Sequence, residues 1–300
     1  MAGCAHHHHH GDIDTGSEKS LIRAIIANMV LTLAQLIGGF LSGSLALIAD
    51  ALHNFSDAAA LWIALIALKI GKKPADEAKS FGYKRAETIG ALINLTTLVI
   101  LGLFLVYEAI KRFYAPEPIV GWAVIGVAGI ALIVDIYTAF LTYRHSKTSM
   151  NMKAAFIHNL TDALASVGVI ISGTLILLYG WVWTDAVITL VIAAYILWHG
   201  LDQMRDVIHL LMEGSPAHLD RKDVIGEMEK IQGVKNVHHV HIWQVNENKI
   251  ALEAHVVLED ISQMDSVKTG LKHLLHDTYG ISHSTLEFEK EPCGDAPDIC

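Results

Sequence analysis

Six long apolar runs occupy the first 211 residues of this 300-residue chain, and they constrain its fold more than any other feature. A helix of about 20 residues is needed to cross a hydrocarbon layer of roughly 30 Å. With 52% hydrophobic and only 18% charged residues, the chain departs from an ordinary soluble domain. The sequence therefore predicts an all-α membrane bundle of six helices, at residues 24–41, 44–68, 86–108, 120–143, 154–178 and 183–211.

Basic residues are unevenly distributed among the connections between these runs. They gather after the second run and after the fourth, whereas the turns at 42–44 and 179–181 carry no charge. Because connections rich in Lys and Arg stay on the cytoplasmic side, both termini are expected in the cytoplasm. The tail before the first run lacks the basic start and cleavage site of a signal peptide, so this run is counted as a span.

The composition excludes two other classes of protein. Residues 213–300 carry 16 acidic and 8 basic side chains, and the chain has no Lys/Arg-rich stripe. Nucleic acid is therefore not expected as a partner, whereas cations are expected to bind. The three cysteines, Cys4, Cys293 and Cys300, lie at the chain ends and cannot form a disulfide framework that holds the fold.

After Met212 the pattern becomes that of a soluble α+β domain. Two stretches have helical spacing and three are rich in β-branched residues or alternate, in the order αββαβ. A ferredoxin-like open-faced sandwich of about 75 residues buries a modest core, so a homodimer is favoured. The expected elements are 219–231, 234–245, 250–258, 264–279 and 284–289. The expected domains are a histidine-rich cytoplasmic tail at 1–18, a six-span membrane domain at 19–212, a soluble α+β domain at 213–292 and a cysteine-containing tail at 293–300.

Two of the apolar runs contain the same His-x-x-x-Asp motif. His53 and Asp57 lie in the second run, and His158 and Asp162 lie in the fifth. Residues four apart share one face of a helix, so each helix presents one imidazole and one carboxylate together. An acid at the centre of a membrane helix costs about 2.5 to 3.5 kcal/mol, which makes chance retention of the pairs improbable. If the two helices face each other, they form a site of two nitrogens and two oxygens that suits tetrahedral Zn²⁺.

Other interpretations of the intramembrane residues remain open. The four side chains would also serve as polar clamps between helices or as a proton pathway without metal. A membrane metalloenzyme and a metal sensor are alternative classes, but four matched ligands leave no open position for water, and six spans exceed what a sensor needs. Asp50 is a fifth ligand, an entry-side acid or a hydrogen-bonded residue, and Asp135 is a proton carrier or forms an inter-helix hydrogen bond.

With these motifs on the second and fifth of six spans and an αββαβ domain behind them, the chain resembles the cation diffusion facilitator family over about residues 19–293. Residues 74–87 resemble the family's entry to the third span, and residues 238–243 resemble the start of its cytoplasmic sheet. The ending at 289–300 is similar to that of the bacterial zinc exporters within the family. The resemblance implies a homodimeric antiporter of the bacterial inner membrane, not an enzyme, that moves Zn²⁺ out of the cytoplasm in exchange for H⁺. It makes residues 19–212 the transport domain and residues 213–292 the metal-binding and dimerisation domain.

The resemblance also implies roles for particular residues. His53, Asp57, His158 and Asp162 form the transport site, and a histidine at the position of His53 is typical of zinc selectivity. His238, His255 and Glu289 match cytoplasmic ligands of a structural Zn²⁺, with His241, Glu291, Cys293 and Cys300 as possible additions. Arg85 and Glu213 match a charge pair near the dimer axis. Tyr83 stands where some relatives place a histidine ligand, so that loop site is not carried over, and His6–His10 are expected to be a native metal-gathering tail rather than an expression tag.

Overall fold

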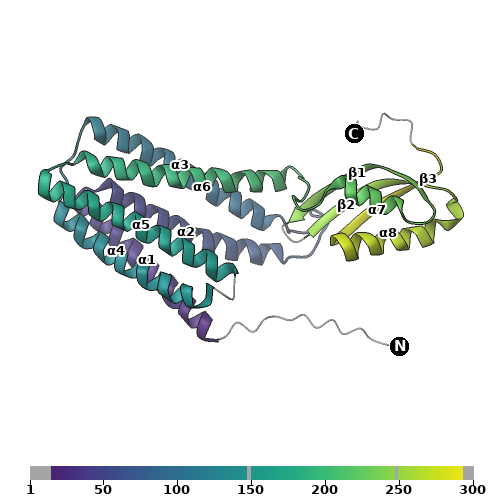
Figure 1. Cartoon of the computed structure of the whole chain (residues 1–300), viewed down its shortest axis with the longest axis horizontal. Coiled ribbons are helices and arrows are strands. Elements are labelled where there is room, and N and C mark those ends of the chain that lie inside the picture. The colour runs from purple at the N-terminus through teal and green to yellow at the C-terminus, as the bar shows by residue number, and fades with distance from the viewer. Residues whose placement is uncertain (1–14, 147–149, 247–248, 293–300) are drawn as a thin grey trace. The chain divides into compact units, whose positions relative to one another are not determined.

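The computed structural model describes residues 15–146, 150–246 and 249–292. Six long helices come first and a small α+β domain follows (Figure 1), which confirms the predicted fold class. The helices are α1 Thr15–Ser42, α2 Leu45–Gly71, α3 Ala86–Tyr114, α4 Gly121–Ser146, α5 Met150–Tyr179 and α6 Trp183–Leu211. The later elements are α7 Arg221–Glu229, β1 Val234–Asn246, β2 Lys249–Leu258, a 3₁₀ turn Ile261–Gln263, α8 Met264–Tyr279 and β3 Ile281–Glu289.

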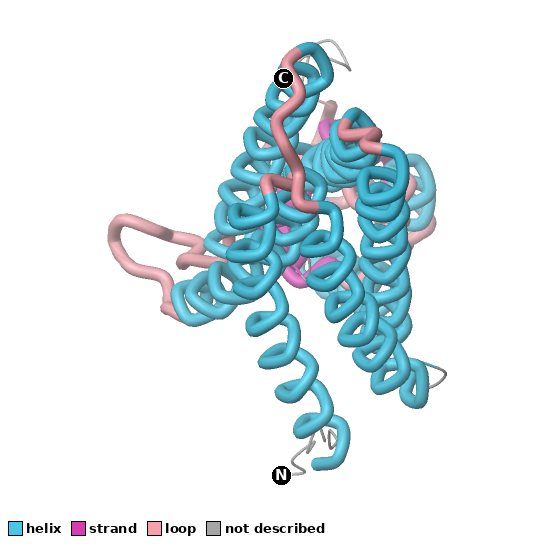
Figure 2. Tube along the Cα trace, turned by 90° about the vertical axis from the view of Figure 1, so that its left-hand side faces the viewer, coloured by secondary structure: helices cyan, strands magenta, loops and turns pink. Residues whose placement is uncertain are grey.

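Among the described residues, five of the six long helices are long and apolar enough to cross a membrane. Helix α1 has 28 residues, but its described apolar stretch, Met29–Ser42, is shorter than those of the other five helices. A helix satisfies its own backbone hydrogen bonds, as a segment in hydrocarbon must. Large apolar side chains such as Phe40, Ile100 and Leu164 are exposed on the bundle, as lipid contact requires. Figure 2 shows that most of the chain visible from this side is helix.

The chain divides into two compact units. The first comprises Met1–Trp62 and Thr96–Gly200, and the second comprises Ile63–Leu95 and Leu201–Cys300. In the first unit α4 packs against α1 and α5. Glycine permits close helix contact in this unit, since a Cβ on Gly39 of α1 would lie 2.6 Å from Ile48 Cγ1 of α2.

One carboxylate organises the short turn between α1 and α2. Asp185, in the first turn of α6, accepts hydrogen bonds from the Ser44 hydroxyl, from Leu45 N at 2.7 Å and from Ala46 N at 3.2 Å. The first N–H groups of a helix have no partner within it, and a negative charge there is favourable. Asp185 therefore caps α2 from a different helix, and it ties together segments about 140 residues apart.

The C-terminal domain contains a three-stranded sheet of order β1-β2-β3. β1 pairs with β2 in the antiparallel direction, whereas β2 and β3 are parallel and are joined by the crossover helix α8. Alternate residues of β2, including Leu252 and Val256, pack with Leu271 and Leu275 of α8 in the core. The intervening residues, including His255, face away from this core, because successive strand side chains point to opposite faces.

Candidate metal centre

The structure brings the two predicted His-x-x-x-Asp pairs together inside the first unit. Asp57 Oδ2 of α2 lies 3.3 Å from His158 Nε2 of α5, and Asp162 Oδ1 of α5 lies 3.8 Å from His53 Nε2 of α2. Within each helix the imidazole and carboxylate approach to 3.8 Å and 3.4 Å. Each carboxylate therefore lies near both imidazoles. Potential ligand atoms of His53, His158 and Asp162 all lie within 4.8 Å of one another.

The burial of these four side chains is unequal. His53 and Asp162 are 7% and 3% exposed, whereas the side chains of Asp57 and His158 are 38% and 40% exposed. Among the residues that the structure describes, neither ring nitrogen of His53 has a hydrogen-bond partner. A buried polar atom without a partner costs about 1 to 3 kcal/mol, and coordination to a cation would remove that cost. Two imidazoles and two carboxylates thus form a donor set that fits a divalent ion such as Zn²⁺.

Helix α6 adds two aromatic rings that the sequence did not point to. Tyr195 packs edge-on against His53, with ring centroids 6.1 Å apart, and it stacks on His199 at 6.0 Å. The only sequence signal was the i, i+4 spacing of Tyr195 and His199 within an apolar run. These contacts restrict the orientation of the His53 ring.

Asp50 and Asp135, the two other intramembrane acids considered from the sequence, have hydrogen-bond partners on other helices. Asp50 is buried and accepts a hydrogen bond from Gln35 Nε2 of α1, whose Oε1 in turn accepts one from Asn54 at 3.2 Å. Asp135 of α4 accepts a hydrogen bond from Ser166 of α5 at 2.9 Å. For both acids, the hydrogen-bonded alternative is therefore the one that the contacts support.

A second cluster lies on the open face of the C-terminal sheet. His255 Nδ1 of β2 lies 2.7 Å from Glu289 Oε1 of β3, and His238 Nε2 of β1 lies 3.3 Å from Glu289 Oε2. His239 joins them, and His238, His239 and His255 offer ligand atoms within 4.8 Å of one another. The three residues expected here from sequence are thus close together, and His239 is an addition.

A bulge in β1 explains why His239 was missed. His238 pairs with His255 and His241 pairs with Glu253, so that residues 239 and 240 stand opposite one residue of β2. His239 has a left-handed φ of 47°, and its ring lies 5.2 Å from that of His238 and 4.9 Å from that of His255. Simple alternation places neighbours on opposite faces, whereas the bulge brings His238 and His239 to the same face.

The other predicted additions to this cluster are not brought into it. His241 stands opposite Glu253 in the strand register, and Glu291 is exposed; neither belongs to the histidine group. Cys293, Cys300 and the run His6–His10 lie outside the described residues.

In the loop between α2 and α3, the Asp76 carboxylate is hydrogen-bonded by other residues of the same loop. Asp76 accepts from the Tyr83 hydroxyl at 2.8 Å and from the backbone N–H groups of Ala78 and Lys79. The Tyr83 hydrogen bond, with help from those N–H groups, lowers the pKa of Asp76. Tyr83 thus binds the carboxylate at the position where a histidine would provide a ligand.

The predicted charge pair is present in the second unit. Arg85 Nη2 lies 3.1 Å from Glu213 Oε1, with the two side chains 35% and 62% exposed. Glu213 follows the end of α6 and has a φ of 61°, in the left-handed region where glycine is usual. A non-glycine residue in this conformation is uncommon and a reason to look for a functional contact.

A bundle of membrane-length helices with buried histidine and carboxylate donors defines a membrane protein that handles cations. Two family models match the chain: the cation efflux transmembrane domain over residues 21–212, and the cytoplasmic domain of cation efflux proteins over residues 216–291. The chain therefore belongs to the cation efflux family, the cation diffusion facilitators that its motifs resemble.

Relatives with established names cover nearly the whole chain. A cadmium, cobalt and zinc/H(+)-K(+) antiporter of Bacillus velezensis is 36% identical over 287 residues, 94% of this chain and 91% of that protein. The zinc transporter ZitB of Escherichia coli is 34% identical over 294 residues, 96% and 94% of the two chains. The metal cation efflux system protein CzcD of Cupriavidus metallidurans is 34% identical over 295 residues, which cover 98% of this chain and 92% of that protein. These relatives are transporters and not enzymes.

Proposed function

We propose that this protein exports Zn²⁺ from the cytoplasm in exchange for H⁺. The observation that carries the proposal is the meeting of His53, Asp57, His158 and Asp162 between α2 and α5, with each carboxylate near both imidazoles. Two carboxylates neutralise a divalent ion where net charge is costly, and mixed N/O donors suit zinc. The apolar runs contain no cysteine, so thiolate-demanding ions are disfavoured.

Competition between protons and metal at these four ligands couples the movement of zinc to the movement of protons in the opposite direction. An imidazole nitrogen binds metal only when it is deprotonated, so zinc loading from the cytoplasm releases protons. When the site faces a more acidic outside, protons return to the ligands and displace the ion. The ligands are close enough to titrate as a group. Exchange is therefore favoured over a leak.

The same proposal includes the setting of the transporter. The basic loops support cytoplasmic termini, and bacterial relatives support a location in the inner membrane. The small core of the C-terminal domain and its match to a cytoplasmic family domain support a homodimer.

Proteoliposomes that contain a zinc-sensitive dye provide the direct test. With the outside of the vesicle at neutral pH and the lumen acidic, zinc added outside should enter faster than into vesicles without a pH difference. Collapse of the gradient with an ionophore should remove that acceleration. Zinc binding without flux, or flux that ignores the gradient, would contradict exchange.

We further propose that the cluster on the C-terminal sheet binds Zn²⁺. Its supporting observation is the convergence of three imidazoles and Glu289 from three neighbouring strands. A metal there would join β1, β2 and β3 and stabilise a small domain.

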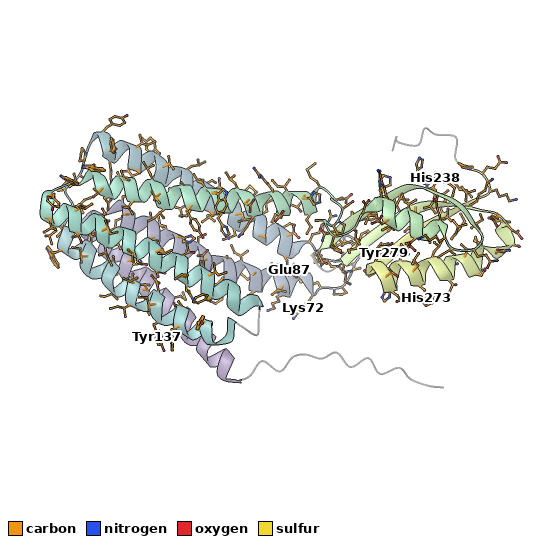
Figure 3. All side chains as sticks on the ribbon, viewed as in Figure 1. Lys72, Glu87, Tyr137, His238, His273 and Tyr279 are labelled. Carbon is orange, nitrogen blue, oxygen red and sulfur yellow. The ribbon has the colours of Figure 1, made fainter. Side chains whose placement is uncertain are left out.

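His239→Asn tests the ligand that the bulge contributes. We expect zinc affinity of this cluster to fall at least about tenfold, since even outer-shell changes reduce metal affinity by that factor. Full-length protein in an Asp162→Asn background, which disables the transport site, would be titrated with zinc against a chelating indicator. His273→Asn is the matched control, because His273 is exposed on α8, on the opposite side of the domain from His238 (Figure 3). Equal affinities in the two variants would contradict a role for His239.

Arg85 and Glu213 are proposed to act as a hinge between subunits, as the family resemblance suggests. An exposed pair contributes only about 0 to 1 kcal/mol, so stability alone does not explain it. Snorkelling of Arg85 to lipid head groups and simple solvation of Glu213 are the alternative. We expect Arg85→Glu and Glu213→Arg each to slow transport or weaken dimerisation, and the charge-swapped double variant to recover part of the loss. Strictly additive losses would show that the residues act independently.

A further inference from the structure

A cavity of about 780 Å³ lies within the second unit, and no residue of the C-terminal histidine cluster lines it. Its apolar walls come from the last turns of α2 and the first turns of α3, through Ile66, Ile70, Ile89 and Ile93. The loop between these helices and Trp243 of β1 complete the lining. A cavity of this size accommodates a small amphiphile. Its apolar side consists of membrane-length helices, so it is positioned to receive a chain from the bilayer.

The polar part of the lining has an excess of positive charge. Lys79, Lys84 and Arg85 line the cavity together with one carboxylate, Glu213. Since Arg85 already pairs with Glu213 at 3.1 Å, the two lysines account for the excess. The hydrogen bond with the Lys249 side chain lowers the pKa of Lys84, and desolvation and the repulsion between the two like charges lower it further. An anion next to these lysines would relieve that repulsion.

We propose that this cavity binds an anionic glycerophospholipid of the cytoplasmic leaflet. Lys79 and Lys84 contact the headgroup phosphate, and an acyl chain lies along the isoleucines of α2 and α3. Basic pockets between membrane helices on the cytoplasmic side are suited to such headgroups. A zwitterionic lipid leaves the excess charge uncompensated, so the site distinguishes lipids by headgroup. A bound lipid would connect the ends of α2 and α3 with the segment that carries Glu213.

Quenching of Trp243 by brominated lipids measures occupancy directly. Full-length protein in detergent would be titrated with brominated phosphatidylglycerol or brominated phosphatidylcholine. The fluorescence of Trp243 is obtained by subtracting the fluorescence of the Trp243→Phe variant measured at each lipid concentration. We expect saturable quenching by phosphatidylglycerol. In Lys79→Gln/Lys84→Gln its affinity should fall at least about tenfold, since each lysine near a membrane surface contributes about a fivefold factor to binding.

Two further double variants separate a specific site from general surface charge. Lys69→Gln/Lys72→Gln removes two exposed lysines from the same region that do not line the cavity, and it should leave the affinity unchanged. Lys72 is labelled in Figure 3. Lys79→Arg/Lys84→Arg should retain binding and show that the fold tolerates changes at both positions. Equal quenching by the two lipids, or equal losses in both glutamine variants, would overturn the proposal. Shielding of Trp243 from both lipids would also overturn it and would indicate that a second copy of the chain fills the cavity.

Discussion

Asp162→Ala is expected to reduce zinc flux by more than about 100-fold, because it removes a side chain that contacts the metal directly. Changes to residues that only support the ligands already reduce metal affinity by about 10-fold to 100-fold. Asp162 is 3% exposed and lies near both His53 and His158. Without it, Asp57 is the one carboxylate left among the four ligands, so a bound divalent ion keeps a net positive charge in a low-dielectric setting. An unpaired buried charge of this kind is strongly unfavourable.

Flux should be measured by dye in proteoliposomes with equal amounts of folded, reconstituted protein. Asp202→Ala is the matched control, since it removes an exposed acid from a bundle helix and should transport at the wild-type rate. Asp162→Asn, which keeps the shape of the side chain, should be as inactive as the alanine variant if charge and coordination matter. Equal zinc uptake by Asp162→Ala and wild-type vesicles would refute the assignment.

His53→Asp is expected to shift the preference from Zn²⁺ toward Cd²⁺ by about tenfold or more, on the scale of a single ligand change. A carboxylate can coordinate through two oxygens, and loss of one imidazole relaxes the compact tetrahedral geometry that favours zinc. The replacement also removes the edge-on contact between His53 and Tyr195, which restricts the ring at this position. The larger ion benefits most from that added space.

A competition assay in which both ions are offered to the same vesicles measures this ratio. His199→Asp is an informative control, because it introduces a carboxylate near the same tyrosine without replacing a proposed ligand. If the coordination argument is right, the ratio should change much less in that variant. An unchanged ratio in His53→Asp, or an equal shift in both variants, would contradict the proposed role of His53.

The local patterns of the chain were sufficient to predict its elements. Apolar runs of membrane length correspond to the long helices, and the predicted strand and helix at 234–245 and 264–279 correspond to β1 and α8. Likewise, the i, i+4 spacing of His53 and Asp57 predicted that they share a helix face, and the 3.3 Å approach of Asp57 to His158 supports the predicted meeting of the two motifs. Such features depend on residues within a few turns of one another, so periodicity is enough to recognise them.

Contacts between distant segments were decided only by the tertiary structure. Asp185 of α6 caps α2, and Tyr195, also of α6, packs against His53 of α2. The β1 bulge moves His239 to the face of His238, which alternation of side chains would not predict. Sequence spacing specifies the direction of a side chain along its own element. Which elements become neighbours, and where a strand departs from regular geometry, follow from packing of the whole chain, because those contacts join residues with no local pattern in common.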